Sequence, residues 1–64
     1  MTEREREVAA LIARGQTNRE IAATLFLGDG TVATHVKHIF AKLGCGSRAQ
    51  VAAWAVENGI AASG

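Results

Sequence analysis

The segment from Thr17 to Leu43 predicts two short helices joined by a tight turn. Thr17 and Glu20 form a T-x-x-E capping box, which is typical of a helix start, and Gly28-Asp29-Gly30 predicts the turn. In the second helix, apolar residues recur at i, i+4, i+7, i+8 and i+11 from Val32 onward, so that one face is apolar and the opposite face is polar. A capped, buried helix followed by a helix with a free polar face is the arrangement of a helix-turn-helix.

Capping and periodicity extend this prediction to an all-α domain of four helices. Thr2 with Glu5 and Ser47 with Gln50 repeat the capping pattern of Thr17. The predicted helices cover about residues 3–14, 18–25, 30–43 and 47–58, and the tail 61–64 is expected to fray. The predicted core consists of apolar residues at helical spacing: Val8, Leu11, Ile12, Ile21, Ala22, Leu25, Val32, Val36, Ile39, Phe40 and Leu43.

Length and composition limit what such a domain can be. The 64 residues suffice for a single domain, 1–64, close to the lower limit for folding without a staple. The single cysteine excludes an internal disulfide. No apolar run approaches the roughly 18 residues of a membrane-spanning helix, and the start, TEREREV, is too charged for a signal peptide. We therefore expect a soluble, cytoplasmic protein with no membrane partner.

The net charge is only +1, but the basic residues are unevenly placed. Between Arg14 and Val56 there are five basic and two acidic residues, whereas residues 1–7 carry three glutamates and two arginines. The excess of positive charge on the helix-turn-helix part favours a nucleic acid as the partner.

The polar face of the predicted helix 30–43 is centred on Thr34. Lys37 beside it can donate to guanine or to a phosphate, Thr34 can hydrogen-bond a base edge, and Ala33 can offer only an apolar contact. A helix of this kind fits the major groove of DNA, which is about 12 Å wide. The alternative is that these residues form the solvated face of an ordinary amphipathic helix. The other members of the face are Gly30, His38 and Ala41.

The predicted helix 47–58 is apolar on nearly every side. Val51, Trp54 and Ala55 form one apolar side. A chain of this size offers too little protein to cover a second side, so the smaller residues predict close packing against another copy in a homodimer. The alternative is a wider contact with helix 3–14. The residues of the predicted dimer side are Ala49, Ala52, Ala53 and Val56.

His35, His38 and Cys45 are of types that bind metals, but the two histidines diverge by about 60° on the helix. We expect His35 at the edge of the core, His38 near a phosphate and Cys45 as an inert turn residue. No Ser-His-Asp, Cys-His or paired-carboxylate pattern is present, and the chain is too small for a substrate pocket. The sequence therefore predicts no metal site, no cofactor and no enzymatic activity.

Residues 2 to about 57 resemble the LuxR/NarL-type helix-turn-helix, the C-terminal effector domain of many bacterial response regulators and quorum-sensing regulators. The resemblance rests on a combination of motifs: T-x-R-E-R-E-V, G-x-T-N-x-E-I-A, T-V-x-T-H-V-x-x-I-x-x-K-L and S-R. It implies a four-helix domain that binds double-stranded DNA, dimerises through its last helix and reads a roughly palindromic operator with helix 30–43. It also implies a fragment of a longer transcription regulator, nucleoid-associated when bound, whose sensor domain lies N-terminal to this domain, as in two-component systems.

The resemblance assigns roles to the matching positions. It implies base contacts by Gly30, Ala33, Thr34 and Lys37. Phosphate contacts are expected mainly at helix N-termini, which bind anions: Thr17, Asn18, Arg19, Thr31, His38, Ser47 and Arg48. Thr17 and Ser47 also fit a purely capping role. The chain departs from the family pattern at Gly28, where a serine usually caps the helix, and at Ala33, where lysine is usual, which predicts weaker or altered base readout.

Two other functions stay open. A similar four-helix shape occurs in the promoter-reading region of sigma factors, so an interaction module for promoter DNA or RNA polymerase is one alternative. The other is a dimerisation-only module in which helix 30–43 is inert.

Overall fold

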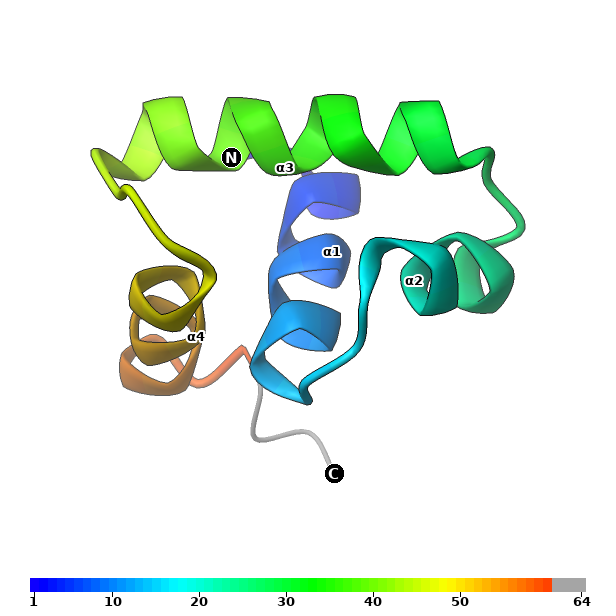
Figure 1. The fold of residues 1–64 in the computed structure, drawn as a ribbon. Helices are drawn as coiled ribbons and strands as arrows, with labels where there is room; N and C mark the ends of the chain where they lie inside the picture. The colour runs from blue at the N-terminus through cyan, green and yellow to red at the C-terminus, as the bar shows by residue number, and fades with distance from the viewer. Residues whose placement is uncertain (61–64) are drawn as a thin grey trace.

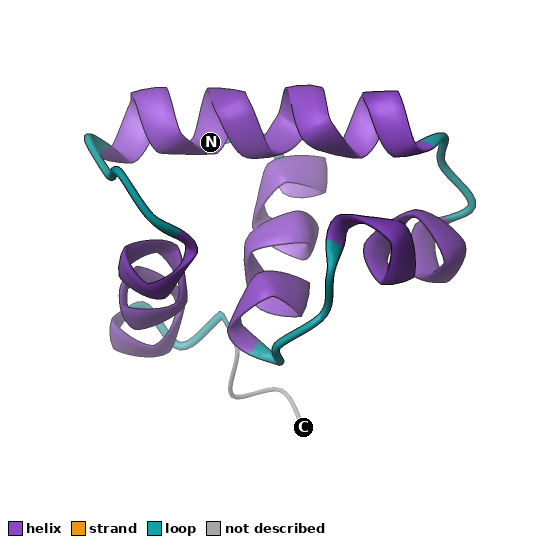
Figure 2. Cartoon of the chain, viewed as in Figure 1, coloured by secondary structure: helices purple, strands orange, loops and turns teal. Residues whose placement is uncertain are grey.

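The structure, a computed structural model, describes residues 1–60. These residues form helices and no strand (Figure 2). The helices are α1 (Glu3–Ala13), α2 (Asn18–Leu25), α3 (Asp29–Leu43) and α4 (Arg48–Glu57). The all-α class is confirmed, and each predicted helix is present with ends that differ by at most one residue. None of the helices in this part of the chain combines the length and the apolar character needed to cross a membrane. The predicted fraying of 61–64 lies outside the described residues.

The helix α1 forms the centre of the domain (Figure 1). Helices α2 and α4 lie on opposite sides of α1, and α3 crosses one end of this group. Helix α4 packs mainly on α1, while α3 packs on α1 and α2. Within residues 1–60, no other helix covers the outer side of α3 (Figure 1), so this face is open to a partner.

All four helices contribute side chains to the core. Val8, Ile21, Ile39 and Val51 are fully buried and belong to α1, α2, α3 and α4 in turn. The predicted core is confirmed, although some of its members are only partly buried at its edge: Leu25, Phe40 and Leu43. Ala9 is fully buried and was not among the predicted core residues.

The predicted capping boxes are complete at two of three helix starts. The side chains of Thr2 and Thr17 each accept a hydrogen bond from the backbone N–H three residues on, and the glutamate there accepts the threonine N–H. At α4 only half of the box forms. Ser47 Oγ accepts from the Gln50 N–H at 3.3 Å, but the Gln50 side chain accepts from the Gly46 N–H at 2.7 Å. Ser47 has a φ of −151°, against −74° and −76° at the two threonines, so its own N–H is directed differently.

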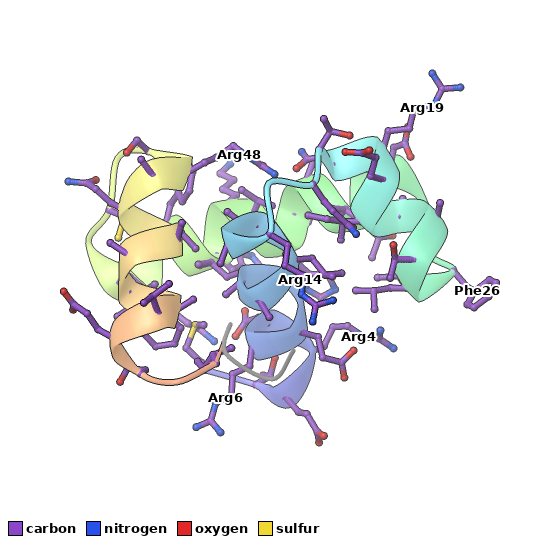
Figure 3. The ribbon with its side chains drawn as sticks, turned by 90° about the horizontal axis from the view of Figure 1, so that it is seen from below. Arg4, Arg6, Arg14, Arg19, Phe26 and Arg48 are labelled. Carbon is purple, nitrogen blue, oxygen red and sulfur yellow. The ribbon has the colours of Figure 1, made fainter. Side chains whose placement is uncertain are left out.

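The turn between α2 and α3 differs from the prediction. Asp29 and Gly30 are already helical, so the turn consists of residues 26–28. Its left-handed residue is Phe26, with φ 57° and ψ 44°, and not a glycine. The Phe26 side chain is 94% exposed and points away from the domain (Figure 3). Gly28 has an ordinary φ of −74° because it serves as the N-cap of α3, without a side-chain cap.

Candidate nucleic-acid interface

The outer face of α3 carries the residues predicted to contact bases. Val32, Val36 and Ile39 are buried on the inner side of the helix. Their burial fixes the rotation of α3 about its axis, because positions on the opposite side must then point outward. The structure accordingly places all the predicted base-contacting residues, exposed, on one uncovered face: Gly30, Ala33, Thr34 and Lys37.

The hydroxyl of Thr34 is already oriented by the helix. Its Oγ1 donates to the Gly30 carbonyl oxygen at 3.0 Å. A hydroxyl has one donor and two acceptor positions, so Thr34 still offers an acceptor oxygen and a methyl group. The acceptor suits the amino groups of adenine or cytosine, and the methyl suits the methyl of thymine. In this rotamer Thr34 has no proton left to donate to guanine O6.

Lys37 is a basic residue of this face and lies beside its central residue, Thr34. It is exposed and has no hydrogen bond or ion pair to any described residue. Arg19 on α2 is likewise exposed, and Figure 3 shows its side chain extending away from the domain. Both side chains can therefore reach a DNA partner without breaking an internal bond.

Lys42, near the end of the same helix, is differently placed. Its Nζ lies 2.8 Å from Glu5 Oε1, which joins the end of α3 to the start of α1. Glu5 is a buried charged residue, with 3% of its surface exposed. His38 Nδ1 lies 4.0 Å from Glu5 Oε2, so this predicted phosphate contact sits beside an internal carboxylate. The positive charge of Lys42 is balanced within the domain.

Glu5 interacts with residues of α3 in addition to capping the start of α1. Hydrogen bonds from Lys42 and from the Thr2 backbone N–H lower the pKa of Glu5 from its ordinary value near 4.5 to about 2, against the opposing effect of its burial. The sequence identified Glu5 only as half of a capping box. Its burial was missed because the partner from α3 lies 37 residues away along the chain.

We expect the stability that depends on Glu5 to be lost in acid. The folded-state pKa lies below the unfolded value, so this contribution is complete above about pH 4.5 and disappears as the pH falls toward about 2. Thermal unfolding of the wild-type chain and of Glu5→Gln measures it. The wild type should melt at a higher temperature at pH 7, and the gap should close between pH 4.5 and pH 2. A gap that is the same at every pH would show that the Glu5 charge contributes nothing.

The start of α2 and the start of α4 lie side by side. Arg48 Nη1 donates to Asn18 Oδ1 at 2.7 Å, and Arg48 Nη2 donates to the Gln16 carbonyl oxygen at 2.6 Å. Figure 3 shows Arg48 reaching from α4 toward the segment that leads into α2. Two of the predicted phosphate contacts, Asn18 and Arg48, are thus bonded to each other. The other predicted phosphate contacts are exposed: Thr17, Arg19 and Ser47 at these two helix starts, and Thr31 and His38 on α3.

The two sides of α4 are used differently. Val51 and Ala55 are fully buried, and Trp54 packs at the edge of the core. On the other side Val56 is 65% exposed, Ala49 and Ala53 are exposed, and Ala52 is partly buried. The predicted division of α4 into a core side and an uncovered apolar side is present within a single chain.

Among the described residues, no three histidine, cysteine or acidic side chains lie close enough to hold a metal ion. His35 and Cys45 are partly buried, and the Cys45 thiol donates weakly to the Leu43 carbonyl oxygen at 3.8 Å.

The family model described as "Bacterial regulatory proteins, luxR family" matches residues 1–55, which is most of the chain. The chain belongs to the luxR family. Its similarity to curated members extends across the same region. The chain is 47% identical over 57 residues to the uncharacterized transcriptional regulatory protein YhcZ of Bacillus subtilis, covering 89% of this chain and 27% of that protein. It is 45% identical over 58 residues to the transcriptional regulatory protein LiaR of the same organism, covering 91% of this chain and 28% of LiaR.

This luxR-family domain therefore has a DNA-binding function in bacterial transcription regulation, and its family is not a class of enzymes. The chain spans about a quarter of the length of these relatives, at 27% and 28%. The resemblance inferred from the sequence motifs is confirmed. The structure adds to it two features that the sequence did not indicate, the Glu5–Lys42 ion pair and the hydrogen bonds of Arg48.

Proposed function

We propose that the domain reads double-stranded operator DNA with α3 in the major groove. The observation that carries this proposal is the uncovered face of α3, where Thr34 and Lys37 are exposed directly opposite the buried Val32, Val36 and Ile39. A helix held rigidly on its inner side and free along its outer side has the shape that the groove accepts. Lys37 donates to guanine or a phosphate, and Thr34 accepts from an amino group or contacts a methyl.

Two other positions of this face contribute shape rather than hydrogen bonds. Ala33 offers a methyl group, and Gly30 offers only backbone. An added Cβ at Gly30 would meet nothing within 4 Å, so this position is open to a base edge or to a larger side chain. Specificity in a single copy therefore depends mainly on Thr34 and Lys37.

Phosphate contacts come from the helix starts on either side of the groove. Their free N–H groups and polar side chains favour anions. The proposed residues are, at the helix starts, Thr17, Asn18, Arg19, Thr31 and Ser47 and, within α3, His38. Arg48, which the sequence also predicts to contact a phosphate, is already hydrogen-bonded to Asn18 and Gln16.

A homodimer formed through α4 completes the proposal. With few base-reading groups in each copy, two copies on a roughly palindromic operator supply the specificity that one lacks. Their recognition helices would enter the major groove about 34–36 Å apart, which is one turn of DNA. The protein would act in the bacterial cytoplasm, on the nucleoid. A contact with RNA polymerase remains a prediction from the sequence.

Lys37→Ala tests the position of α3. The duplex is selected from a random-sequence pool by binding to the wild-type chain, and affinity is measured by fluorescence anisotropy over a range of salt concentrations. Loss of a phosphate contact should lower the slope of log affinity against log salt by about one, and loss of a base contact should weaken binding by about 1–3 kcal/mol.

Arg6→Ala is the matched control for this experiment. It removes the same charge from an exposed position on α1, and Figure 3 shows the Arg6 side chain pointing away from the domain. Its affinity and salt slope should stay close to those of the wild type. If Lys37→Ala behaves like Arg6→Ala, α3 does not lie in the groove.

A further inference from the structure

Arg48 occupies an unusual position for a residue expected to bind phosphate. It is the first residue of α4, yet its guanidinium bonds the first residue of α2 and the loop before it, Asn18 and Gln16. The side chain is partly buried, and its two bonds measure 2.7 Å and 2.6 Å. Two of its five N–H donors are therefore committed to internal acceptors.

The bond to Asn18 fixes which way its side-chain amide faces. A guanidinium only donates hydrogen bonds, so the amide must turn its oxygen Oδ1 toward Arg48. The amide nitrogen Nδ2, with its two donors, then points away from Arg48. No described residue accepts a hydrogen bond from Nδ2. The result is a donor of fixed direction at the start of α2.

The segment that carries Asn18 is held from a second side. The Gln16 side-chain oxygen lies 3.2 Å from Thr24 Oγ1, whose single proton it shares with the Glu20 carbonyl oxygen at 2.9 Å, while the Gln16 carbonyl oxygen accepts from Arg48. In the first turn of α2, the Glu20 N–H donates to Thr17 Oγ1. The N–H groups of Asn18 and Arg19 have no acceptor within the helix, because they belong to its first turn. These donors and Asn18 Nδ2 belong to one rigid end of α2.

We propose that Arg48 is a positioning residue for DNA binding, which directs the Asn18 amide N–H toward a backbone phosphate instead of contacting a phosphate itself. This inference rests on the proposed function, in which the start of α2 faces the DNA backbone. It separates two residues that the sequence had given the same role. Asn18 contacts the phosphate, and Arg48 sets the direction from which it does so.

A double-mutant cycle with Asn18→Ala and Arg48→Met tests the division of roles. Methionine keeps much of the packing of the Arg48 stem and removes its charge and donors. If Arg48 acts through Asn18, each single variant should bind the selected duplex about tenfold more weakly, since a hydrogen bond to a charged group is lost. The double variant should also bind about tenfold more weakly than the wild type, as each single variant does, and not about a hundredfold more weakly.

The salt dependence distinguishes positioning from direct contact. In the positioning role, Arg48→Met should leave the salt slope near that of the wild type, because no phosphate contact by a charged group is lost. A slope lower by about one, together with losses that multiply in the double variant, would overturn the proposal in favour of a direct Arg48–phosphate contact. Unchanged affinity in Asn18→Ala would overturn it as well.

A measurement on the wild-type chain keeps the test independent of folding. If circular dichroism shows that Arg48→Met is unfolded, ¹⁵N-labelled wild-type protein is titrated with the same duplex. The Asn18 side-chain NH₂ resonances should shift as DNA is added, and resonances that do not move would reject the contact. Lys37→Ala distinguishes failure of this inference from failure of the proposed function. If Lys37→Ala weakens binding but the Asn18 and Arg48 variants do not behave as coupled, only the role of Arg48 is wrong. If Lys37→Ala has no effect on binding, the proposed function itself is wrong.

Discussion

Val56→Glu is expected to weaken binding to a palindromic operator by about a hundredfold or more. Val56 is 65% exposed on the uncovered side of α4, where a buried glutamate would oppose close packing of two copies. Two linked copies bind two half-sites with an avidity that exceeds single-site affinity by about 10²–10⁴. Sedimentation should show monomers, and anisotropy with the selected duplex should show the loss of affinity.

The controls separate dimerisation from DNA contact. A duplex with one half-site scrambled should bind Val56→Glu and the wild type alike, because one copy contacts it in either case. Ala23→Glu places the same charge on an exposed position of α2 and should leave sedimentation unchanged. A Val56→Glu variant with the wild-type monomer–dimer equilibrium would rule out α4 as the interface.

Ile39→Ala is expected to reduce the free energy of unfolding by about 2–5 kcal/mol. Ile39 is fully buried on the inner side of α3, so its truncation leaves a cavity beneath the recognition helix. A domain of this size has a stability of only about 3–5 kcal/mol, so most of the variant should be unfolded at 37 °C. Urea unfolding followed by circular dichroism measures the change.

Ala41→Gly is the companion variant on the same helix. Ala41 is exposed, so this change removes helix propensity without opening a cavity and should cost about 1 kcal/mol. A loss in Ile39→Ala no larger than this would mean that α3 is not held by its buried face.

The helices were predictable because their signals are local in the sequence. The capping boxes at Thr2 and Thr17 mark two helix starts within three residues of the cap. The apolar stripe through Val32, Val36 and Ile39 determines the rotation of α3, since burial of one face leaves the opposite face outside. The same periodicity predicted which residues of α3 would be exposed together.

The features that were missed depend on how the helices cross. Glu5 is bonded to Lys42, which lies 37 residues away in the sequence, and Arg48 is bonded to Asn18, which lies 30 residues away. The periodicity of one helix does not show which residues of another helix it will contact. At Phe26 the error had another cause, because two nearby glycines suggested a turn while the helix needed one of them as its cap. The roles of individual residues in DNA binding and in dimerisation remain predictions.

The ion pair of Lys42 with Glu5 has a consequence for the affinity of the domain for DNA that is not its operator. Because its charge is paired with the Glu5 carboxylate, Lys42 should displace few counterions from arbitrary DNA, and that displacement supplies most of the attraction to random sequence. A weaker attraction to random sequence leaves more molecules available to the operator among the many competing sites of a genome. For a domain with few base-reading groups, lower affinity for random sequence raises specificity as effectively as higher affinity for the operator, because specificity is the ratio of the two.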